Sequence, residues 1–451
     1  MDTGALGSLR NAISGEVRDD LEARASASRD ESPVEGTSDA VVRPSDAEDL
    51  MALVRWARAH HVPLTARGGG TSLEGESVPV QGGVVVDFHR WSSIGTPNAL
   101  EGTVRVGPGV VNHDLHVALR PTGWFYPPNP GSWRSCTIGG NIATNAAGPR
   151  SFRYGPTRRW VHSVEAVLGT GERVVLGPTT TKRSVGPELL DLLVGSEGTC
   201  GFVTSATLRL APQAERRAGL AVPVTEGASL ARIVTSLAGP PWARLSAIEY
   251  VDARVAAALA ERPHAGIPGS HALVLLEVES DDEPSESRAL ESLDRRLRAG
   301  GLTEEATVVP DADRLWSLRG EAGSAIAETA GPSVREDVVV PLAQLDEYLQ
   351  RLDSLARSLR VRWHLYGHLG QGNLHPAFEV DPRSAAGAKA RGAILDLARS
   401  LGGSVSGEHG VGALKRAYVA AELGEPAVRL LREAKRACDP DGILNPGKLL
   451  P

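Results

Sequence analysis

Cysteine is scarce in this 451-residue chain, and long apolar runs are missing. The three cysteines, Cys136, Cys200 and Cys438, are far apart and form no CxxC pair, which excludes a disulfide scaffold and predicts reduced thiols. There is no run of about 18 apolar residues, and residues 1–25 lack the apolar core of a secretory signal. We therefore expect a cytoplasmic protein that does not span a membrane, with peripheral attachment to the inner face of the membrane left open.

An excess of positive charge is also missing. The formal net charge is −7 at pH 7, so we expect no nucleic-acid partner and no basic patch for membranes. With 41% hydrophobic and 23% charged residues, the composition is that of a globular protein, and the length predicts two or three domains. Glycine is abundant at 50 residues, and its clustering in a few loops carries the functional signal.

Hydrophobic periodicity predicts an α+β arrangement in the first half of the chain. A strand at 40–42 precedes a helix that begins with a capping box of Ser45 and Glu48. The buried face of this helix is predicted at positions spaced three and four apart, namely Leu50, Leu53, Val54 and Ala57. Further strands are predicted at 62–66, 84–87, 103–106 and 199–210, with a hairpin at 164–175 that turns at 169–171.

Strands and helices alternate in the second half. Strands are predicted at 218–222, 247–251, 272–278, 338–340 and 362–366, and helices at about 226–238, 285–299, 343–359 and 383–401. This alternation predicts a βαβ-rich sheet that is covered on one side. After Gly402 we expect a glycine loop, two helices and the tail Asn445-Pro446-Gly447-Lys448.

Three glycine-rich segments, at 67–72, 135–148 and 195–201, are suited to bring backbone close to a ligand. Successive glycines can present N–H groups to a pyrophosphate, and the hydroxyls of Thr71 and Ser72 add donors. One such segment alone would be an ordinary turn, but three together favour a cofactor site. None of them follows the G-x-G-x-x-G pattern of a Rossmann NAD site or the phosphate-binding loop of nucleotide hydrolases.

A histidine–glutamate constellation occurs late in the chain. His368 and His375 lie within Gly-His-Leu-Gly-Gln-Gly-Asn-Leu-His, and Glu408 and His409 within Gly-Glu-His-Gly. Two imidazoles and a carboxylate, with positions left for substrate, form the open ligand set of a catalytic divalent metal. Zinc is the first choice, and manganese or iron is the alternative. The competing interpretation is that the histidines are hydrogen-bonded structural residues.

The glycine segments RGGGTSLEG, PPNPGSWRSCTIGGNIATNAAGPRSFRYG and GSEGTCGFVT, in this order, resemble the FAD-binding domain of the vanillyl-alcohol-oxidase-like flavoproteins. The whole set of motifs is similar to the group of the glycolate oxidase FAD subunit, D-lactate dehydrogenase and D-2-hydroxyglutarate dehydrogenase. The resemblance implies an α+β fold with a two-part PCMH-type FAD-binding domain, a ferredoxin-like α+β cap and a returning C-terminal helical segment. The expected boundaries are a lead-in at 1–35, the FAD domain at 36–213, the cap at 214–403 and the C-terminal segment at 404–451.

The resemblance also implies where the FAD lies. The residues expected at the pyrophosphate are Gly68, Gly69, Gly70, Thr71 and Ser72. Those expected beside the ribityl chain and the isoalloxazine ring are Ser135, Cys136, Gly139, Gly140 and Asn145. Those expected near the adenosine end are Glu197, Gly201 and Val203, and Asn445 in the tail is expected to return to the flavin. Non-covalent FAD is expected, since the first loop lacks the histidine that some relatives use for covalent attachment.

For the reaction centre, the resemblance implies His368, His375 and Glu408 as metal ligands and His409 as the base. Substrate carboxylates need a fixed cation, and arginine binds them bidentately. The expected substrate-binding residues are Arg319, Arg335 and Asn373, with Arg319 the stronger candidate. The chain departs from the family pattern at Gln371, usually Asp, and at Ala377, usually Asn, which concerns the substrate side of the pocket.

The expected activity is oxidation of a D-2-hydroxy acid, of the glycolate, D-lactate or D-2-hydroxyglutarate type, to the 2-oxo acid. Hydride passes to flavin N5, and a divalent metal and a histidine base assist. The alternatives are a flavoenzyme like alkylglycerone-phosphate synthase and a non-catalytic FAD-binding subunit of a glycolate oxidase complex. The electron acceptor (quinone, cytochrome, electron-transfer flavoprotein or oxygen), the acid, the metal and the oligomeric state, homodimer or hetero-oligomer with related subunits, stay open.

Overall fold

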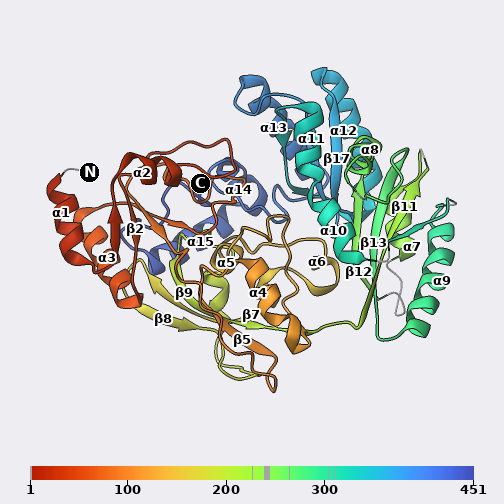
Figure 1. Ribbon diagram of the computed structural model, residues 1–451. Helices are drawn as coiled ribbons and strands as arrows, with labels where there is room; N and C mark the ends of the chain where they lie inside the picture. Colours follow the sequence, from red (N-terminus) through yellow and green to blue (C-terminus); the bar gives the residue numbers. More distant parts are fainter. Residues whose placement is uncertain (1–2, 226, 238–243, 264, 303, 310) are drawn as a thin grey trace. The chain divides into compact units, whose positions relative to one another are not determined.

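The computed structural model describes residues 3–225, 227–237, 244–263, 265–302, 304–309 and 311–451, which form two compact units (Figure 1). Unit 1 comprises Met1–Ala147, Pro156–Pro212 and Glu408–Pro451. Unit 2 comprises Gly148–Gly155 and Gln213–Gly407. The expected lead-in thus belongs to unit 1, and the short segment Gly148–Gly155, expected in the FAD domain, belongs to unit 2. Helices and sheets occur in both units, so the predicted α+β class is confirmed.

The first sheet of unit 1 has four strands in the order β1-β2-β4-β3, in which β4 lies parallel to β2 and β3, and β1 antiparallel to β2. These strands are β1 (Glu16–Arg18), β2 (Ala40–Arg43), β3 (Leu64–Arg67) and β4 (Val84–Asp87). The helices of this part are α1 (Thr3–Ala12), α2 (Leu21–Ala27) and α3 (Ala47–His60). The predicted buried face of α3 is confirmed, because all four of its residues are fully buried. The lead-in also contains ordered elements that periodicity missed, α1, β1 and α2.

The predicted capping box of α3 is wrong by one residue. Asp46 is the N-cap, and its carboxylate accepts the N–H of Asp49 at 2.9 Å. The amide of Ser45 instead donates to the carboxylate of Asp49, also at 2.9 Å. That carboxylate additionally accepts the N–H groups of Ser14 and Gly15 at 2.6 and 2.9 Å. Asp49 therefore fixes the connection between α1 and β1.

The second sheet of unit 1 is antiparallel, in the order β5-β9-β7-β8. Its strands are β5 (Thr103–Val106), β7 (Val161–Leu168), β8 (Arg173–Leu176) and β9 (Gly201–Arg209), and β7 with β8 forms the predicted hairpin. The remaining elements of this part are β6 (Trp124–Phe125), β10 (Ala211–Pro212), α4 (Asn112–Leu119), α5 (Ile138–Thr144) and the 3-10 turns Arg120–Thr122, Thr157–Arg159 and Leu189–Leu192.

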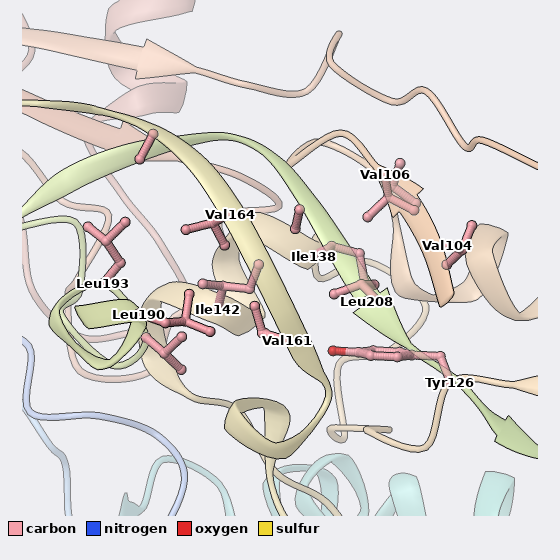
Figure 2. Close-up of a cluster of buried hydrophobic side chains, with 14 of the residues drawn as sticks. Val104, Val106, Tyr126, Ile138, Ile142, Val161, Val164, Leu190, Leu193 and Leu208 are labelled. Atoms are coloured by element: carbon pink, nitrogen blue, oxygen red, sulfur yellow. The ribbon is translucent and has the colours of Figure 1, made fainter. Parts of the chain in front are cut away.

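One apolar cluster positions the second glycine segment. Figure 2 shows Ile138 and Ile142 of α5 in the same cluster as Val161 and Val164 of β7. Because Ile138 and Ile142 lie one helical turn apart, they anchor one face of α5 on the sheet. The glycines between and beside them therefore have fixed positions.

The sheet of unit 2 is antiparallel throughout, in the order β14-β11-β13-β12-β17-β18-β15, with β16 also paired to β18. Its strands are β11 (Arg216–Val224), β12 (Leu245–Val251), β13 (Ala272–Ser280), β14 (Thr307–Val309), β15 (Val334–Arg335), β16 (Val338–Val339), β17 (Trp363–His368) and β18 (Asn373–Phe378). Its helices are α6 (Ser151–Tyr154), α7 (Leu230–Leu237), α8 (Ala253–Ala260), α9 (Glu283–Ala299), α10 (Ala312–Gly320), α11 (Ala322–Ala330), α12 (Leu345–Leu359) and α13 (Ala385–Ser400), with 3-10 turns at Leu342–Gln344 and Leu369–Gln371. Residues 226 and 238, the ends of one predicted helix, lie outside the described residues.

The expected βαβ units are present in a split form. β11 and β12, joined through α7, both pair antiparallel with β13, which lies between them. β13 and β14, joined through α9, flank β11 in the same way, so the order β14-β11-β13-β12 is ferredoxin-like. The prediction of cover on one side is wrong, because α8, α10 and α11 pack on the face opposite to α7 and α9 (Figure 1).

The C-terminal segment forms the two predicted helices, α14 (Arg416–Leu423) and α15 (Glu425–Cys438), and then returns to the first sheet of unit 1. The N–H of Leu64 donates to the carbonyl of Ile443 at 2.8 Å, and the N–H of Asn445 donates back to Leu64 at 2.7 Å. Ile443 and Leu444 are buried in the core of that sheet. In the described part of the chain, no helix has the length and apolar character that crossing a membrane requires.

Candidate functional site

The first glycine loop follows β3 and lies directly against the second glycine segment. A Cβ at Gly68 would lie 2.2 Å from Oγ1 of Thr137, and a Cβ at Gly69 would lie 2.2 Å from the carbonyl oxygen of Ser135. Gly70 has a positive φ of 68°. Only glycine permits the two close contacts, and a positive φ is adopted far more readily by glycine than by residues with a Cβ. The two predicted pyrophosphate and ribityl segments therefore come together, and backbone rather than side chains forms their contact.

The second segment enters α5 through Thr137, the N-cap, whose hydroxyl accepts the N–H of Gly140 at 3.3 Å. A Cβ at Gly139 would lie 2.7 Å from Cβ of Pro108. The helix ends at Asn145, which has a φ of 53° and whose side-chain oxygen accepts the N–H of Arg158 at 2.9 Å. These contacts make the segment compact, and its small side chains suit the flat flavin ring that is predicted to bind there.

Cys136 lies inside this segment and is nearly fully buried. Burial raises the pKa of the Cys136 thiol to about 11, so the thiol stays protonated at neutral pH. Cys136, Cys200 and Cys438 are all free thiols and all buried. Cys136 is therefore a packing residue of the predicted flavin segment and not a nucleophile.

The third segment fixes the loop that follows Glu408 and His409. The buried carboxylate of Glu197 accepts the N–H groups of Val411 and Gly412 at 2.6 and 2.9 Å. Burial raises the pKa of Glu197 to about 7. Because the carboxylate already accepts these two N–H groups, we expect the backbone of Glu197, and not its side chain, to lie near the adenosine end of FAD. Gly201 and Val203 begin β9.

The tail residue Asn445 joins two of these loops. Its side-chain amide donates to the carbonyl oxygens of Glu76 and Glu197 at 2.9 and 2.6 Å. Next to it, the ammonium of Lys448 donates to the carbonyl of Val78 at 2.6 Å, and burial lowers the pKa of Lys448 to about 8. The tail therefore holds together the loops that contain Glu76, Val78 and Glu197.

Sequence reasoning missed a buried ion pair in the same region. The ammonium of Lys415 lies 2.9 Å from a carboxylate oxygen of Glu74, and both side chains are buried. The N–H of Ala413 donates to the carbonyl of Glu74 at 2.8 Å. The sequence feature that could have indicated this ion pair is Glu74, a charged residue within the motif RGGGTSLEG.

In unit 2, strand pairing brings His368 and His375 together. β17 and β18 pair so that Tyr366 faces His375 and His368 faces Asn373. The two imidazole rings are perpendicular, with centroids 5.3 Å apart, and ring nitrogens of the two lie within 4.8 Å of each other. Both histidines are buried. The spacing fits two ligands of one ion, so the donor chemistry and the geometry both suit a divalent metal.

A carboxylate that sequence reasoning missed joins this pair to Arg319. One oxygen of Glu249 lies 2.7 Å from Nδ1 of His368, and the other lies 2.8 Å from a guanidinium nitrogen of Arg319. Arg319 is buried, and its guanidinium carbon lies 4.9 Å from the centre of the Tyr366 ring. The signal was a single Glu inside the apolar strand Ala-Ile-Glu-Tyr-Val, where a buried charge needs partners.

Arg335 and Asn373 occupy different environments. Arg335 is exposed in β15, and one of its guanidinium nitrogens donates to the carbonyl of Gly323 at 3.3 Å. Asn373 is buried, and its amide donates to the carboxylate of Asp337 at 2.6 Å and to the carbonyl of Val338 at 3.0 Å. The substrate roles of both residues stay predictions. Asp337 also lies 3.7 Å from Nδ1 of His375, which makes it a neighbour of the histidine pair.

Glu408 and His409 begin the unit 1 segment directly after Gly407, the last residue of unit 2. The N–H of Gly407 donates to the carboxylate of Asp337 at 2.8 Å. Nε2 of His409 lies 4.0 Å from a carboxylate oxygen of Glu408. Their roles as ligand and base stay predictions, while the amides at 411 and 412 give their loop a fixed conformation within unit 1.

Of the two departures from the family pattern, Ala377 is fully buried in the core of unit 2, opposite Arg335 and His364 in the strand pairing. Gln371 ends the 3-10 turn between the two histidines and is exposed.

Two family models cover most of the chain. The model of an FAD binding domain matches residues 38–177. The model of the C-terminal domain of FAD linked oxidases matches residues 211–449. The first contains two of the three glycine segments, and the second contains Arg319, the histidine pair and the Gly-Glu-His-Gly motif.

Several curated proteins are similar over nearly the whole length. Glycolate oxidase subunit GlcD of Bacillus subtilis is 32% identical over 417 residues, 91% of this chain and 88% of the relative. A D-lactate dehydrogenase of Archaeoglobus fulgidus is 35% identical over 424 residues, 91% of each protein. A D-2-hydroxyglutarate dehydrogenase of Xanthomonas citri is 33% identical over 428 residues, 91% of this chain and 89% of the relative.

Among solved structures, 4-ethylphenol oxidase from Gulosibacter chungangensis matches with a TM-score of 0.77, covering 99% of this chain and 96% of that one. An alkyldihydroxyacetonephosphate synthase matches with a TM-score of 0.76, covering 99% and 86%. At 18% identity each, these two show the fold alone. The family models and the relatives at 32–35% identity show that this chain belongs to the FAD-linked oxidases, as an FAD-linked oxidoreductase of the glycolate oxidase, D-lactate dehydrogenase and D-2-hydroxyglutarate dehydrogenase group.

Proposed function

We propose that this protein oxidises a D-2-hydroxy acid, of the glycolate, D-lactate or D-2-hydroxyglutarate type, to the 2-oxo acid with non-covalently bound FAD. The observation that carries the proposal is the shared carboxylate of Glu249, which joins Arg319 to His368. A 2-hydroxy acid presents a carboxylate next to a hydroxyl. A site that oxidises it needs a cation for the first group beside a polarising centre for the second. Arg319 would supply the cation, and a metal bound by His368 would supply the polarising centre.

Arg319 is the proposed anchor of the substrate carboxylate. Its guanidinium is buried, so an ion pair formed there is screened less by water than one at the surface. Glu249 already balances the charge of Arg319. A second carboxylate therefore needs additional positive charge nearby, which favours a cation at the histidine pair. Arg335 and Asn373 are proposed to line the same substrate region.

His368, His375 and Glu408 are proposed to hold a divalent metal, with zinc first and manganese or iron as alternatives. Such an ion, when bound, polarises a coordinated hydroxyl and lowers its pKa. The observations in support are the close ring nitrogens of the two histidines and their burial. A carboxylate oxygen of Asp337 lies 3.7 Å from Nδ1 of His375, beside the proposed ligand set.

His409 is proposed to accept the hydroxyl proton of the substrate. An imidazole has an ordinary pKa of about 6.5, which suits a base at neutral pH. The two hydrogen bonds from the 411–412 amides to Glu197 keep the loop that carries His409 in one conformation. A base held in this way loses little entropy when it meets the substrate.

The glycine loops are proposed to hold the FAD, which when bound supplies the hydride acceptor. The close contacts at Gly68, Gly69 and Gly139 support this, because they leave backbone as the lining of the site. The electrons leave to an acceptor of the quinone, cytochrome, electron-transfer flavoprotein or oxygen class.

The test is anaerobic bleaching of the flavin. The purified protein should be yellow, and at least one of glycolate, D-lactate and D-2-hydroxyglutarate should bleach it, while the L-enantiomers of the latter two should not. His409→Ala should keep the FAD and lose the bleaching by several orders of magnitude. His89→Ala, at an exposed position of unit 1, is the matched control and should bleach like the natural protein. An FAD-loaded protein that no 2-hydroxy acid reduces would contradict the proposal.

A further inference from the structure

Glu249 is a buried carboxylate with two partners from different elements. It lies in the middle of β12 and is completely inaccessible to solvent. One oxygen contacts Nδ1 of His368 in β17, and the other contacts Arg319 in α10. Burying a charge is unfavourable unless both its oxygens are compensated, and here each oxygen has its own partner.

The contact with His368 determines how that ring can bind a metal. Because Nδ1 is committed to the carboxylate, a metal would be bound through the other ring nitrogen, Nε2. A carboxylate on the remote nitrogen also fixes the orientation of the ring and raises its basicity as a ligand.

The contact with Arg319 fixes the proposed substrate anchor from the other side. The guanidinium is held between the carboxylate at 2.8 Å and the face of Tyr366 at 4.9 Å. Tyr366 in turn stacks near His375, with ring centroids 5.0 Å apart. A shift of Glu249 would thus move the anchor and a metal ligand together.

We propose that Glu249 is a positioning residue that couples metal affinity to recognition of the substrate carboxylate. The inference rests on the proposed function, because it takes His368 as a metal ligand and Arg319 as the substrate anchor. It adds a residue that contacts neither the substrate nor the metal and yet controls both.

The same sheet contains a matched control. Glu379, just after β18, has one oxygen 2.8 Å from Nε2 of His364 and the other 2.7 Å from Arg362. His364 lies four residues before His368 in β17, and it is not a proposed ligand. The variant E379Q therefore removes the same charge from a similar but more exposed His–Glu–Arg arrangement that contains no proposed metal ligand.

The experiment compares the natural protein, E249Q and E379Q as full-length, FAD-loaded proteins stripped of metal with a chelator. Zinc and manganese affinities are measured by competition with a chromophoric chelator, and KM and kcat with the best acid of the bleaching test. We expect E249Q to bind zinc about 10- to 100-fold more weakly and to have a raised KM, with its FAD content unchanged. E379Q should match the natural protein in both measurements.

Equal zinc affinity of E249Q and the natural protein, or an equal loss in E379Q, would overturn the inference. A natural protein that takes up no metal would overturn both the proposed metal site and this inference. If metal binds but no acid bleaches the flavin, the proposed activity fails, while the zinc titration still decides the role of Glu249. Should E249Q lose its FAD through misfolding, E249D is measured, and the inference then requires a zinc affinity below that of the natural protein.

Discussion

Because Gly69 has no Cβ, the first glycine loop can lie in contact with the second glycine segment. The space that a Cβ would need is occupied by the carbonyl oxygen of Ser135, which belongs to a backbone and cannot rotate away. The contact joins the loop predicted for the pyrophosphate to the segment predicted for the flavin ring. We therefore expect Gly69 to be a structural requirement of the predicted FAD site and not a flexible link.

The substitution Gly69→Ala should weaken FAD binding by tenfold or more and destabilise the protein by about 1–3 kcal/mol, the usual cost of overpacking. FAD titration by fluorescence and thermal unfolding measure the two effects. Gly131→Ala is the control, because no heavy atom lies within 4 Å of a Cβ there. Equal behaviour of the two variants would show that the loops can separate without cost.

At this scale, sequence reasoning found residues that stand in local motifs and missed those joined by folding. His368 and His375 are seven positions apart, and the glycines between them predict a turn. Glu249 is 119 positions from His368, and only the pairing of β12 with β17 brings it near. The residue pattern around Glu249 does not predict this contact, because many different strand pairings are compatible with the same local pattern.

Among the secondary elements, α3 shows how closely helix boundaries depend on one side chain. The segment Ser45-Asp46 offers two residues that commonly cap helices, and the sequence alone favoured Ser45 through its spacing to Glu48. In the folded protein the amide of Ser45 donates to the carboxylate of Asp49. Asp46 is the N-cap, and its carboxylate accepts the N–H of Asp49. The same carboxylate of Asp49 also accepts the N–H groups of Ser14 and Gly15, so the end of the helix is tied to the segment between α1 and β1.

Asp46→Ala should therefore cost about 1 kcal/mol of the free energy of unfolding, the usual value for a lost N-cap. Ser45→Ala keeps the backbone amide that Asp49 accepts, so its cost should be smaller. Urea unfolding of both variants measures the difference. A larger loss at Ser45 than at Asp46 would restore the original capping assignment.

The other elements were predictable to the extent that their own residues determine them. Helix α12 and the β7–β8 hairpin follow from periodicity and turn residues. The ferredoxin-like strand order did not, because the position of β13 between β11 and β12 depends on long-range pairing. Similarly, the second helical layer, which α8, α10 and α11 form, could not be predicted from the sequence. The apolar residues of these segments would fit a buried helix on either face of the sheet.

At the scale of the whole molecule, unit 1 is assembled from three separate stretches of chain, and unit 2 largely from one. Residues 408–451 complete unit 1 through the core residues Ile443 and Leu444 and through the hydrogen bonds of Asn445. The loops of the predicted FAD site are thus held by residues more than 200 positions away from them.

A chain that ends at Gly407 should lose FAD binding, because it lacks the residues that fasten the 74–78 and 195–201 loops. Its unit 1 should melt at a lower temperature and gain little stability from added FAD. Removal of Pro451 alone, an exposed residue, is the control and should leave both properties unchanged. Retained FAD in the shortened chain would show that the first two stretches suffice.

The discontinuity of unit 1 also sets an order of events during synthesis. A ribosome releases residues 213–407 before it has made the tail, so unit 2 has all its parts while unit 1 still lacks its last stretch. Asn445 and Lys448 are made after every residue of unit 2. Flavin binding at the predicted loops should therefore require residues that the ribosome makes only after all of unit 2.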